Sequence, residues 1–226
     1  RLSCITCFDF YEEEMKRYTC CIWDFNGTIL DDVETGIKSV NKLLAERGLR
    51  TLNGKEDYYR YFGFPIKAYY ESLGFDFSVE SYEELAPKWV SEYLINVKDA
   101  PLCPCVKDSL ELLRQNGIKQ IIISATELDM LKCQLGDLGI AEYFDEVCGL
   151  DNIHAASKVE LAKRWRDENP TVRAVFIGDT EHDFETATAM GIECFLVEGG
   201  HQPRRTLEAT GARIFSNVGE ACREII

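Results

Sequence analysis

The chain has 226 residues, a length that fits one large domain or a domain with a modest insertion. Hydrophobic residues make up 46% and charged residues 28%, which excludes wholesale disorder and leaves enough apolar mass for a core. The formal net charge of −14 disfavours nucleic acid as a partner, because so acidic a surface repels a phosphate backbone. An anionic substrate therefore needs a local site that overcomes this field, and a metal ion is the usual means.

The sequence also bears on membranes, secretion and cysteine chemistry. No run of about 18 apolar residues occurs, so we expect no membrane-spanning helix. Residues 1–14 lack a basic segment followed by an apolar one, and we expect a peripheral extension rather than a secretory signal. The Cys-x-x-Cys pair at Cys4 and Cys7 has no second pair to complete a zinc site. We therefore expect reduced thiols that act as small apolar side chains, in a cytoplasmic protein.

In chain order, apolar runs typical of buried strands alternate with stretches of helical periodicity. The predicted strands cover residues 18–25, 119–124, 172–177, 192–197 and 212–215. The predicted helices cover residues 105–116, 128–138 and 218–225, with others that end at Gly48, begin at Lys158 and end at Gly191. This repetition predicts an α/β fold with a Rossmann-like parallel sheet core and helices on both faces. In such sheets ligands bind at the carboxyl ends of the strands.

Residues 31–100 interrupt this alternation, because they contain no convincing strand. Twelve aromatic residues lie between Tyr58 and Tyr93. We interpret residues 31–100 as an inserted α-helical cap domain with its own aromatic core. Residues 15–30 and 101–226 then form the sheet domain. An alternative use of the aromatic side chains is a cage that binds substrate.

Acidic side chains directly follow two predicted strands. The segment 24–28 reads Asp-Phe-Asn-Gly-Thr, and the second group contains Asp179 and, four residues later, Asp183. Carboxylates that converge at a sheet edge repel each other unless a divalent cation or a lysine lies between them. Simpler alternatives are an Asx turn and a solvated acidic helix cap. A calcium loop is excluded, because its sixth and twelfth positions would be Ile29 and Thr35.

Two further polar residues accompany these acids. Ser124 ends a predicted strand and precedes a helix, so its hydroxyl and the first helix amides could bind phosphate. The alternative is that Ser124 is only the N-cap of that helix. No Gly-x-Ser-x-Gly sequence surrounds Ser124, so the nucleophile turn of a serine hydrolase is not supported. Lys158 begins a predicted helix, and in isolation such a lysine is ordinarily solvated.

In order and spacing, these four groups resemble the four motifs of the haloacid dehalogenase superfamily of phosphate hydrolases. The likeness is to the phosphoglycolate-phosphatase-like branch, whose helical cap is inserted after the first motif. It covers residues 17–226 and includes the cap stretches 62–66 and 69–76. The resemblance implies a magnesium-dependent phosphatase that acts on a small phosphorylated metabolite through an aspartyl-phosphate intermediate.

The resemblance also implies a role for each acidic motif residue. Asp24 would be the nucleophile that attacks phosphorus. Mg²⁺ would be held by the carboxylates of Asp24 and Asp179 and by the backbone carbonyl of Asn26. Asp183 would act from outside the metal's own ligands, by orienting a bound water or Lys158.

The phosphoryl oxygens would be held by Ser124, Ala125 and Lys158, and Lys158 would neutralise charge that moves during transfer. Arg60 and Lys67 are cap cations that could bind a second anionic group, although both also fit an ordinary exposed surface. The expected partner is a small phosphorylated substrate, with neither nucleic acid nor a membrane. A monomer is the default expectation for the oligomeric state.

Asn26 departs from the family pattern, which usually has Asp two residues after the nucleophile. That Asp protonates the leaving oxygen and then activates water, and an amide cannot exchange a proton at neutral pH. General acid–base catalysis is typically worth about 10²–10⁴ in rate. The chain could therefore be a slow phosphatase or one that prefers a good leaving group, such as an acyl phosphate or an anhydride. The alternative is a catalytically weak, phosphoryl-ligand-binding or regulatory protein. A mutase or a true dehalogenase is disfavoured.

Overall fold

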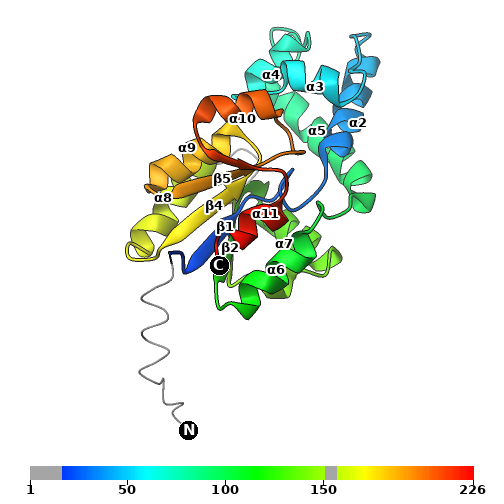
Figure 1. The fold of residues 1–226 in the computed structure, drawn as a ribbon. Helices are drawn as coiled ribbons and strands as arrows, with labels where there is room; N and C mark the ends of the chain where they lie inside the picture. The colour runs from blue at the N-terminus through cyan, green and yellow to red at the C-terminus, as the bar shows by residue number, and fades with distance from the viewer. Residues whose placement is uncertain (1–16, 151–156) are drawn as a thin grey trace, which may run out of the picture.

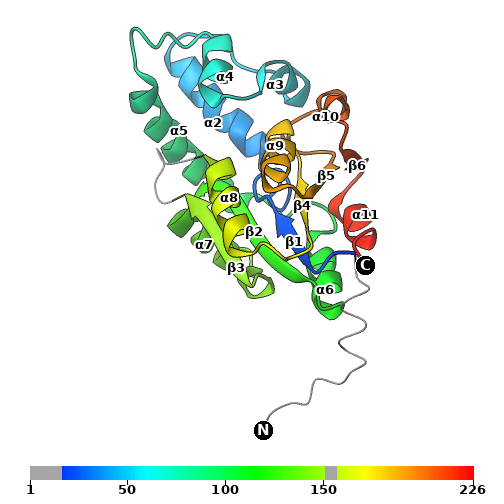
Figure 2. The same ribbon diagram turned by 90° about the vertical axis from the view of Figure 1, so that its left-hand side faces the viewer.

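The computed structural model describes residues 17–150 and 157–226, and Figures 1 and 2 show its fold. The extension predicted for residues 1–14, with Cys4 and Cys7, lies outside the described residues. Within them, six strands form one parallel sheet in the order β3-β2-β1-β4-β5-β6. The strands are β1 (Cys20–Trp23), β2 (Lys119–Glu127), β3 (Glu146–Leu150), β4 (Ala174–Gly178), β5 (Glu193–Val197) and β6 (Arg213–Phe215).

Helices cover both faces of the sheet, as the alternation along the chain predicts. One face carries α6 (Val106–Gln115), α7 (Leu128–Asp137) and α11 (Val218–Arg223), and the other carries α8 (Lys158–Glu168), α9 (Glu181–Met190) and α10 (Arg204–Thr210). In β1, Cys21 and Trp23 pack against the first set, whereas Cys20 and Ile22 pack against the second. Both faces of β1 are therefore buried, which explains why this strand is apolar throughout.

Residues 31–100 are helical and contain no strand, as predicted. They form α2 (Val33–Glu46), α3 (Lys55–Tyr61), α4 (Ile66–Ser72), α5 (Tyr82–Asn96) and the short 3₁₀ helix η1 (Val97–Asp99). Tyr58, Tyr69 and Tyr70 pack with Val40 and Leu44 in a separate hydrophobic cluster. The inserted residues therefore have a hydrophobic cluster of their own, to which aromatic side chains contribute.

The two connections between the cap and the sheet domain run side by side. Leu30 and Leu102 form an antiparallel bridge, and the Asp31 N–H donates to the Pro101 carbonyl at 2.9 Å. The chain therefore enters and leaves the cap at one place, above the carboxyl end of β1 (Figure 1).

Some elements differ from the sequence prediction. The edge strand β3, the 3₁₀ helix η2 (Ala141–Tyr143) and α10 were not expected. The strand β3 contains Gly149 and is only partly buried, and Leu207 is the only buried residue of α10, so neither has a strong apolar pattern. The strand β2 runs on to Glu127, beyond the predicted end at residue 124. Within the described residues, none of the helices combines the length and the apolar character needed to cross a membrane.

Candidate active site

Asp24 directly follows β1, in the middle of the sheet. Its backbone N–H donates to the Ile177 carbonyl of β4 at 2.8 Å, and the residue is only 8% exposed. The Asp24 carboxylate accepts a hydrogen bond from the ammonium group of Lys158, the first residue of α8. That ammonium group also donates to Asp183 Oδ1 at 2.5 Å. The lysine is therefore not a solvated surface residue, because it is buried between two carboxylates.

Asp179 follows β4 and is fully buried. Its Oδ1 accepts a hydrogen bond from Thr28 Oγ1 at 2.8 Å, and its Oδ2 accepts one from the backbone N–H of His201 at 2.6 Å. The backbone approaches this carboxylate closely at Gly27 and at Gly200, and Gly27 has a φ of +76°. A Cβ at Gly27 would lie 2.3 Å from Asp179 Oδ2, and one at Gly200 would lie 2.2 Å from it. Two glycines are thus needed for the backbone to enclose Asp179.

Asp183 lies in the first turn of α9 and caps its start. Its Oδ2 accepts hydrogen bonds from the backbone N–H groups of Asp179 at 3.1 Å and Thr180 at 2.9 Å, and from Thr180 Oγ1 at 2.7 Å. Burial would raise the pKa of Asp183, but the charge of Lys158 and these hydrogen bonds hold that pKa below its usual value. Asp183 is therefore a fixed anion that anchors the lysine.

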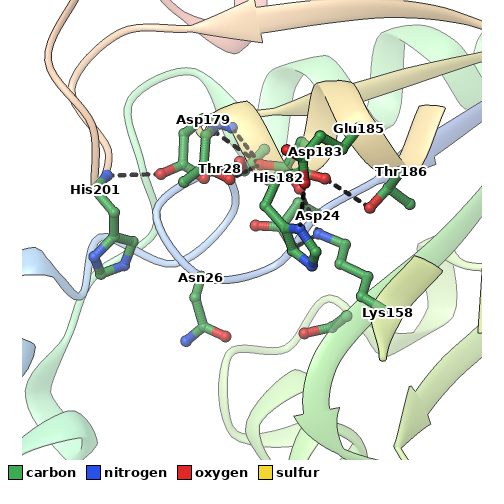
Figure 3. A network of polar contacts seen from close by, with 12 residues as sticks. Asp24, Asn26, Thr28, Lys158, Asp179, His182, Asp183, Glu185, Thr186 and His201 are labelled. Carbon is green, nitrogen blue, oxygen red and sulfur yellow. Dashed lines mark hydrogen bonds and ion pairs between the residues drawn. The ribbon is translucent and has the colours of Figure 1, made fainter. Parts of the chain in front are cut away.

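The three carboxylates converge (Figure 3): one oxygen from each of Asp24, Asp179 and Asp183 lies within 4.8 Å of the others. Burial raises the pKa of Asp24 well above its usual range, although the Lys158 charge opposes this shift. Burial also raises the pKa of Asp179 to about 6, against the charge of His201. The positive charge near Asp24 and Asp179 is therefore too small to offset the burial of their carboxylates. Carboxylate oxygens are ligands that suit a divalent cation of the Mg²⁺ or Ca²⁺ type.

Figure 3 shows the Asn26 amide set apart from these carboxylates. Its Nδ2 donates to Asp32 Oδ2 and to the Tyr93 hydroxyl, both at 2.8 Å, and its Oδ1 accepts from Thr126 Oγ1 at 2.8 Å. Tyr93 comes from α5 of the cap. The Asn26 side chain therefore joins the cap to the sheet domain and has its hydrogen-bonding capacity largely used.

Asp32 and His201 form a largely buried pair beside Asn26, and no role was expected for either from the sequence. His201 Nε2 lies 3.1 Å from Asp32 Oδ1, and His201 Nδ1 lies 2.8 Å from the Tyr58 hydroxyl. Burial would lower the pKa of His201, but the Asp32 carboxylate raises it to about 9. The pair also lowers the pKa of Asp32, despite its burial. The only signals in the sequence that could have pointed to this pair were an acid soon after Asn26 and a histidine after a predicted strand.

Ser124 does not cap α7. Its hydroxyl donates to Thr126 Oγ1 and accepts from the Thr126 backbone N–H, both at 3.0 Å. The N-cap is Glu127, whose carboxylate accepts from two backbone N–H groups in the first turn of the helix. The helix amides that were predicted to bind phosphate are thus already bonded to Glu127. Ser124 and Ala125 nevertheless border the same cavity as Asp24.

A cavity of about 350 Å³ lies between the sheet domain and the cap. The predicted site residues that line it are Asp24, Asn26, Ser124, Ala125, Lys158 and Asp183. Asp179 lies behind them without bordering the cavity. Hydrogen bonds from the cap close this space over the sheet domain, and one runs from the Tyr59 hydroxyl to the Gly200 carbonyl at 2.9 Å. The sheet thus brings the acids and Lys158 together at one end of the cavity.

Known proteins resemble this chain in sequence and in fold. The profile of the family described as haloacid dehalogenase-like hydrolase matches residues 21–197. Phosphoglycolate phosphatase of Aquifex aeolicus is 27% identical over 190 residues, which cover 80% of this chain and 84% of that protein. The phosphoglycolate phosphatase of Rhodobacter capsulatus is 26% identical over 187 residues, with the same coverage of 80% and 84%. A solved haloacid dehalogenase-like hydrolase from Streptococcus pneumoniae has a TM-score of 0.80 at 19% identity, covering 93% of this chain and 99% of that one.

Proposed function

Since the chain belongs to the haloacid dehalogenase-like hydrolase family, in its phosphoglycolate-phosphatase-like branch, we propose that it is a magnesium-dependent phosphohydrolase. The proposed substrate is a small phosphorylated metabolite, and the reaction passes through an aspartyl-phosphate on Asp24. The observation that carries this proposal is that Lys158 is buried between Asp24 and Asp183 beside the cavity, with Asp179 directly behind them.

In the first step an oxygen of Asp24 forms a bond to phosphorus as the bond from phosphorus to the leaving oxygen breaks. An anionic nucleophile cannot approach an anionic phosphate unless positive charge lies between them. Lys158 supports this role, because its ammonium group already contacts Asp24 and is held by Asp183. Ser124 and Ala125 line the same end of the cavity and are proposed to bind further phosphoryl oxygens.

The carboxylates of Asp24 and Asp179, with the Asn26 backbone carbonyl, are the proposed holders of Mg²⁺. When bound, the ion supplies positive charge to the nucleophile and to the phosphoryl oxygens. Asp183 is proposed to position Lys158 and a water on the ion from outside its direct ligands. The raised pKa values of Asp24 and Asp179 support this assignment, because a cation would relieve the shortage of positive charge there.

In the second step water hydrolyses the aspartyl-phosphate, which releases phosphate and restores Asp24. The Asn26 amide cannot take the proton from that water or give one to the leaving group. Its bonds to Asp32, Tyr93 and Thr126 favour a positioning role instead. We therefore propose slow turnover of alkyl esters, whose leaving oxygen needs a proton.

A catalytically weak protein that binds a phosphorylated ligand is the second candidate, because the usual acid–base carboxylate is replaced by Asn26. Release of phosphate from p-nitrophenyl phosphate and acetyl phosphate, with Mg²⁺ and with a chelator, separates the two. We expect release from both compounds that stops when the metal is removed. If neither is hydrolysed while calorimetry still detects binding of Mg²⁺ and of inorganic phosphate, the second candidate is correct.

We also propose the cellular compartment, the partners and the oligomeric state. The eight cysteines within the described residues are free thiols, which fits a reducing compartment such as the cytoplasm. A net charge of −14 argues against nucleic acid as a partner. We propose a monomer that acts alone on its substrate, and light scattering during size-exclusion chromatography tests this.

A further inference from the structure

The cap side of the cavity is a wall of aromatic rings, in contrast to the charged end on the sheet domain. The aromatic residues that line it are Tyr58, Phe62, Phe64, Tyr69, Tyr70, Tyr82, Trp89 and Tyr93. All of them lie between the two connections to the sheet domain. Phe62, Phe64, Tyr82 and Trp89 present apolar surface to the space that the rest of a substrate would occupy, and the other four rings are buried behind them.

The rings of this wall are held in fixed relative positions. Tyr58 and Phe62 are stacked with ring centres 4.8 Å apart, and Phe62 meets Tyr69 edge to face at 5.3 Å. Trp89 and Tyr93 are stacked at 4.9 Å. These spacings lie in the range that aromatic pairs prefer, about 4.5–7 Å. A flat ring entering the cavity therefore meets preorganised faces and edges.

Positive charge for a second anionic group is scarce on the same wall. Among the described residues that line the cavity, only Lys158, His182 and His201 can be cationic. Each already faces a carboxylate: Lys158 contacts Asp24 and Asp183, His182 lies 3.2 Å from a glutamate, and His201 lies 3.1 Å from an aspartate. A substrate with a carboxylate or a second phosphate would place that charge in the cavity without a free cation among the described lining residues.

Arg60 and Lys67, the two cap cations noted in the sequence, do not supply positive charge to the cavity. Arg60 has a side chain that is 67% exposed and lies near Asp57, and Lys67 lies over the Phe77 ring at 5.3 Å. Neither borders the cavity. The wall therefore favours an uncharged group.

Asn26 independently points to an aromatic leaving group. Without an acid at this position, the leaving oxygen departs as an anion, so the reaction favours leaving groups that are stable when ionised. A phenol ionises at a pKa of about 10, as the tyrosine side chain does. A water-like hydroxyl ionises only at about 15.7. Among phosphate esters whose leaving group can depart without a proton, the esters of phenols also match the aromatic wall.

We infer that the substrate is an aryl phosphate whose ring carries no charge, and that the cap aromatics bind this ring. The inference rests on the proposed phosphohydrolase activity. An oxygen of Asp24 bonds to phosphorus, the bond from phosphorus to the aryl oxygen breaks, and the electron pair stays on the phenolate. The phenolate takes a proton from bulk water after it leaves. Water then hydrolyses the aspartyl-phosphate, releasing inorganic phosphate.

The first test compares substrates on the full-length protein with Mg²⁺. We expect the KM for phenyl phosphate to be at least about tenfold below that for 4-carboxyphenyl phosphate, because the added carboxylate has no cation to meet. We expect kcat/KM for phenyl phosphate to exceed that for phosphoglycolate about 100-fold, since both charge and leaving group then favour the aryl ester. Acetyl phosphate, which has no ring and a good leaving group, reports the phosphohydrolase activity by itself.

The second test uses a matched pair of cap substitutions. Phe62→Leu removes one ring of the wall, and Phe77→Leu makes the same change in a cap residue that does not line the cavity. We expect Phe62→Leu to lower the ratio of kcat/KM for phenyl phosphate to that for acetyl phosphate about fivefold. Phe77→Leu should leave this ratio within about twofold. Phe64→Arg, at a ring that is 37% exposed, should shift the preference toward 4-carboxyphenyl phosphate.

The outcomes separate this inference from the proposed function. Hydrolysis of acetyl phosphate with equal KM values for phenyl and 4-carboxyphenyl phosphate would overturn the aromatic-ring site and leave the phosphohydrolase intact. If neither acetyl phosphate nor any of the esters is hydrolysed, the proposed function is wrong, and calorimetry with phenylphosphonate and methylphosphonate still tests the ring site. Tighter binding of phenylphosphonate would then support the ring site, and equal binding would overturn it.

Discussion

The sheet domain and the cap build opposite ends of one cavity, and they fix their side chains by different means. At the sheet end a few buried charges are each held by short bonds, as Asp183 is by Lys158 and Thr180. At the cap end the side chains are rings held by packing against each other. We propose that charge at one end recognises the phosphate and that apolar area at the other selects the group attached to it.

This difference predicts unequal sensitivity to substitution. A buried charge that loses its partner is strongly destabilised, whereas a ring in an aromatic cluster shares its contacts with several neighbours. Changes at the sheet end should therefore abolish turnover, and changes in the cap should alter preference or stability by modest amounts.

The largest effect is expected for Asp24→Asn, which removes the proposed nucleophile. We expect phosphate release from acetyl phosphate to fall by about 10⁴-fold or more, since an amide does not form the covalent intermediate. Asp167→Asn makes the same change at an exposed position on α8 and should keep full activity. A variant at Asp24 that kept a tenth of the activity would mean that another group attacks phosphorus.

Lys158→Met should come next, because it leaves Asp24 and Asp183 facing each other without the ammonium group. We expect turnover to fall about 10³-fold. We also expect the free energy of unfolding in urea to fall by about 3 kcal/mol in the presence of a chelator. Added Mg²⁺ should raise the stability of this variant more than that of the wild type, by binding the uncompensated carboxylates. Equal responses to Mg²⁺ would contradict the proposed metal site.

Asn26→Asp tests the missing acid, but the structure adds a complication. The new carboxylate would face Asp32, to which Asn26 now donates a hydrogen bond. The single variant should therefore melt at a lower temperature, and the double variant Asn26→Asp with Asp32→Asn should recover part of that loss. In the double variant we expect kcat for an alkyl phosphate to rise about 10²-fold and kcat for phenyl phosphate to change much less. Equal gains on both esters would show that residue 26 is not where the proton is transferred.

The smallest effect is expected on the cap surface, where Glu80 pairs with Arg47 at 2.7 Å and with Lys88 at 2.5 Å. Hydrogen bonds from Arg47 and Lys88 lower the pKa of Glu80 from 4.5 to about 2. A pKa that is lowered in the folded state stabilises the fold above pH 4.5, and this contribution is lost as the pH falls toward 2.

Glu80→Gln should therefore reduce the free energy of unfolding by about 0.5 kcal/mol at pH 7. The difference from the wild type should shrink as the pH approaches 2. Urea unfolding of both proteins at several pH values measures it, and turnover at pH 7 should be unchanged. A loss of activity would mean that the cap surface affects the charged end of the cavity.

Much of the fold and part of the site follow from the sequence. Apolar runs predicted the central strands, and the family and branch suggested by the motifs are confirmed by the comparisons. Asp24 and Asp179 could be expected to meet, because each follows a strand and parallel strands end at one edge of the sheet. In the structure those strands, β1 and β4, are direct neighbours.

Other parts of the site depend on tertiary contacts that leave no local pattern. Asp32 and His201 are far apart in the chain and meet only in the folded structure, where the Gly27 N–H also donates to Asp32. Ser124 looked like a helix cap because the strand seemed to end there, whereas three more residues precede α7 and Glu127 takes the capping role. The order of residues in the chain could not predict the Asp32–His201 contact or show whether Ser124 or Glu127 caps α7.

The adjacent connections at Leu30 and Leu102 have a consequence for how this molecule can change. The covalent link to the inserted segment consists of two neighbouring ends joined by a bridge, whereas Tyr58, Tyr59 and Tyr93 make separate side-chain hydrogen bonds to the sheet domain. A different segment with similarly close ends could be joined there without altering the strands, provided that it supplies new hydrogen-bond partners for Asn26 and His201. The connection therefore lets the inserted segment change in sequence and length while the sheet domain keeps its strand order and the acids at the strand ends.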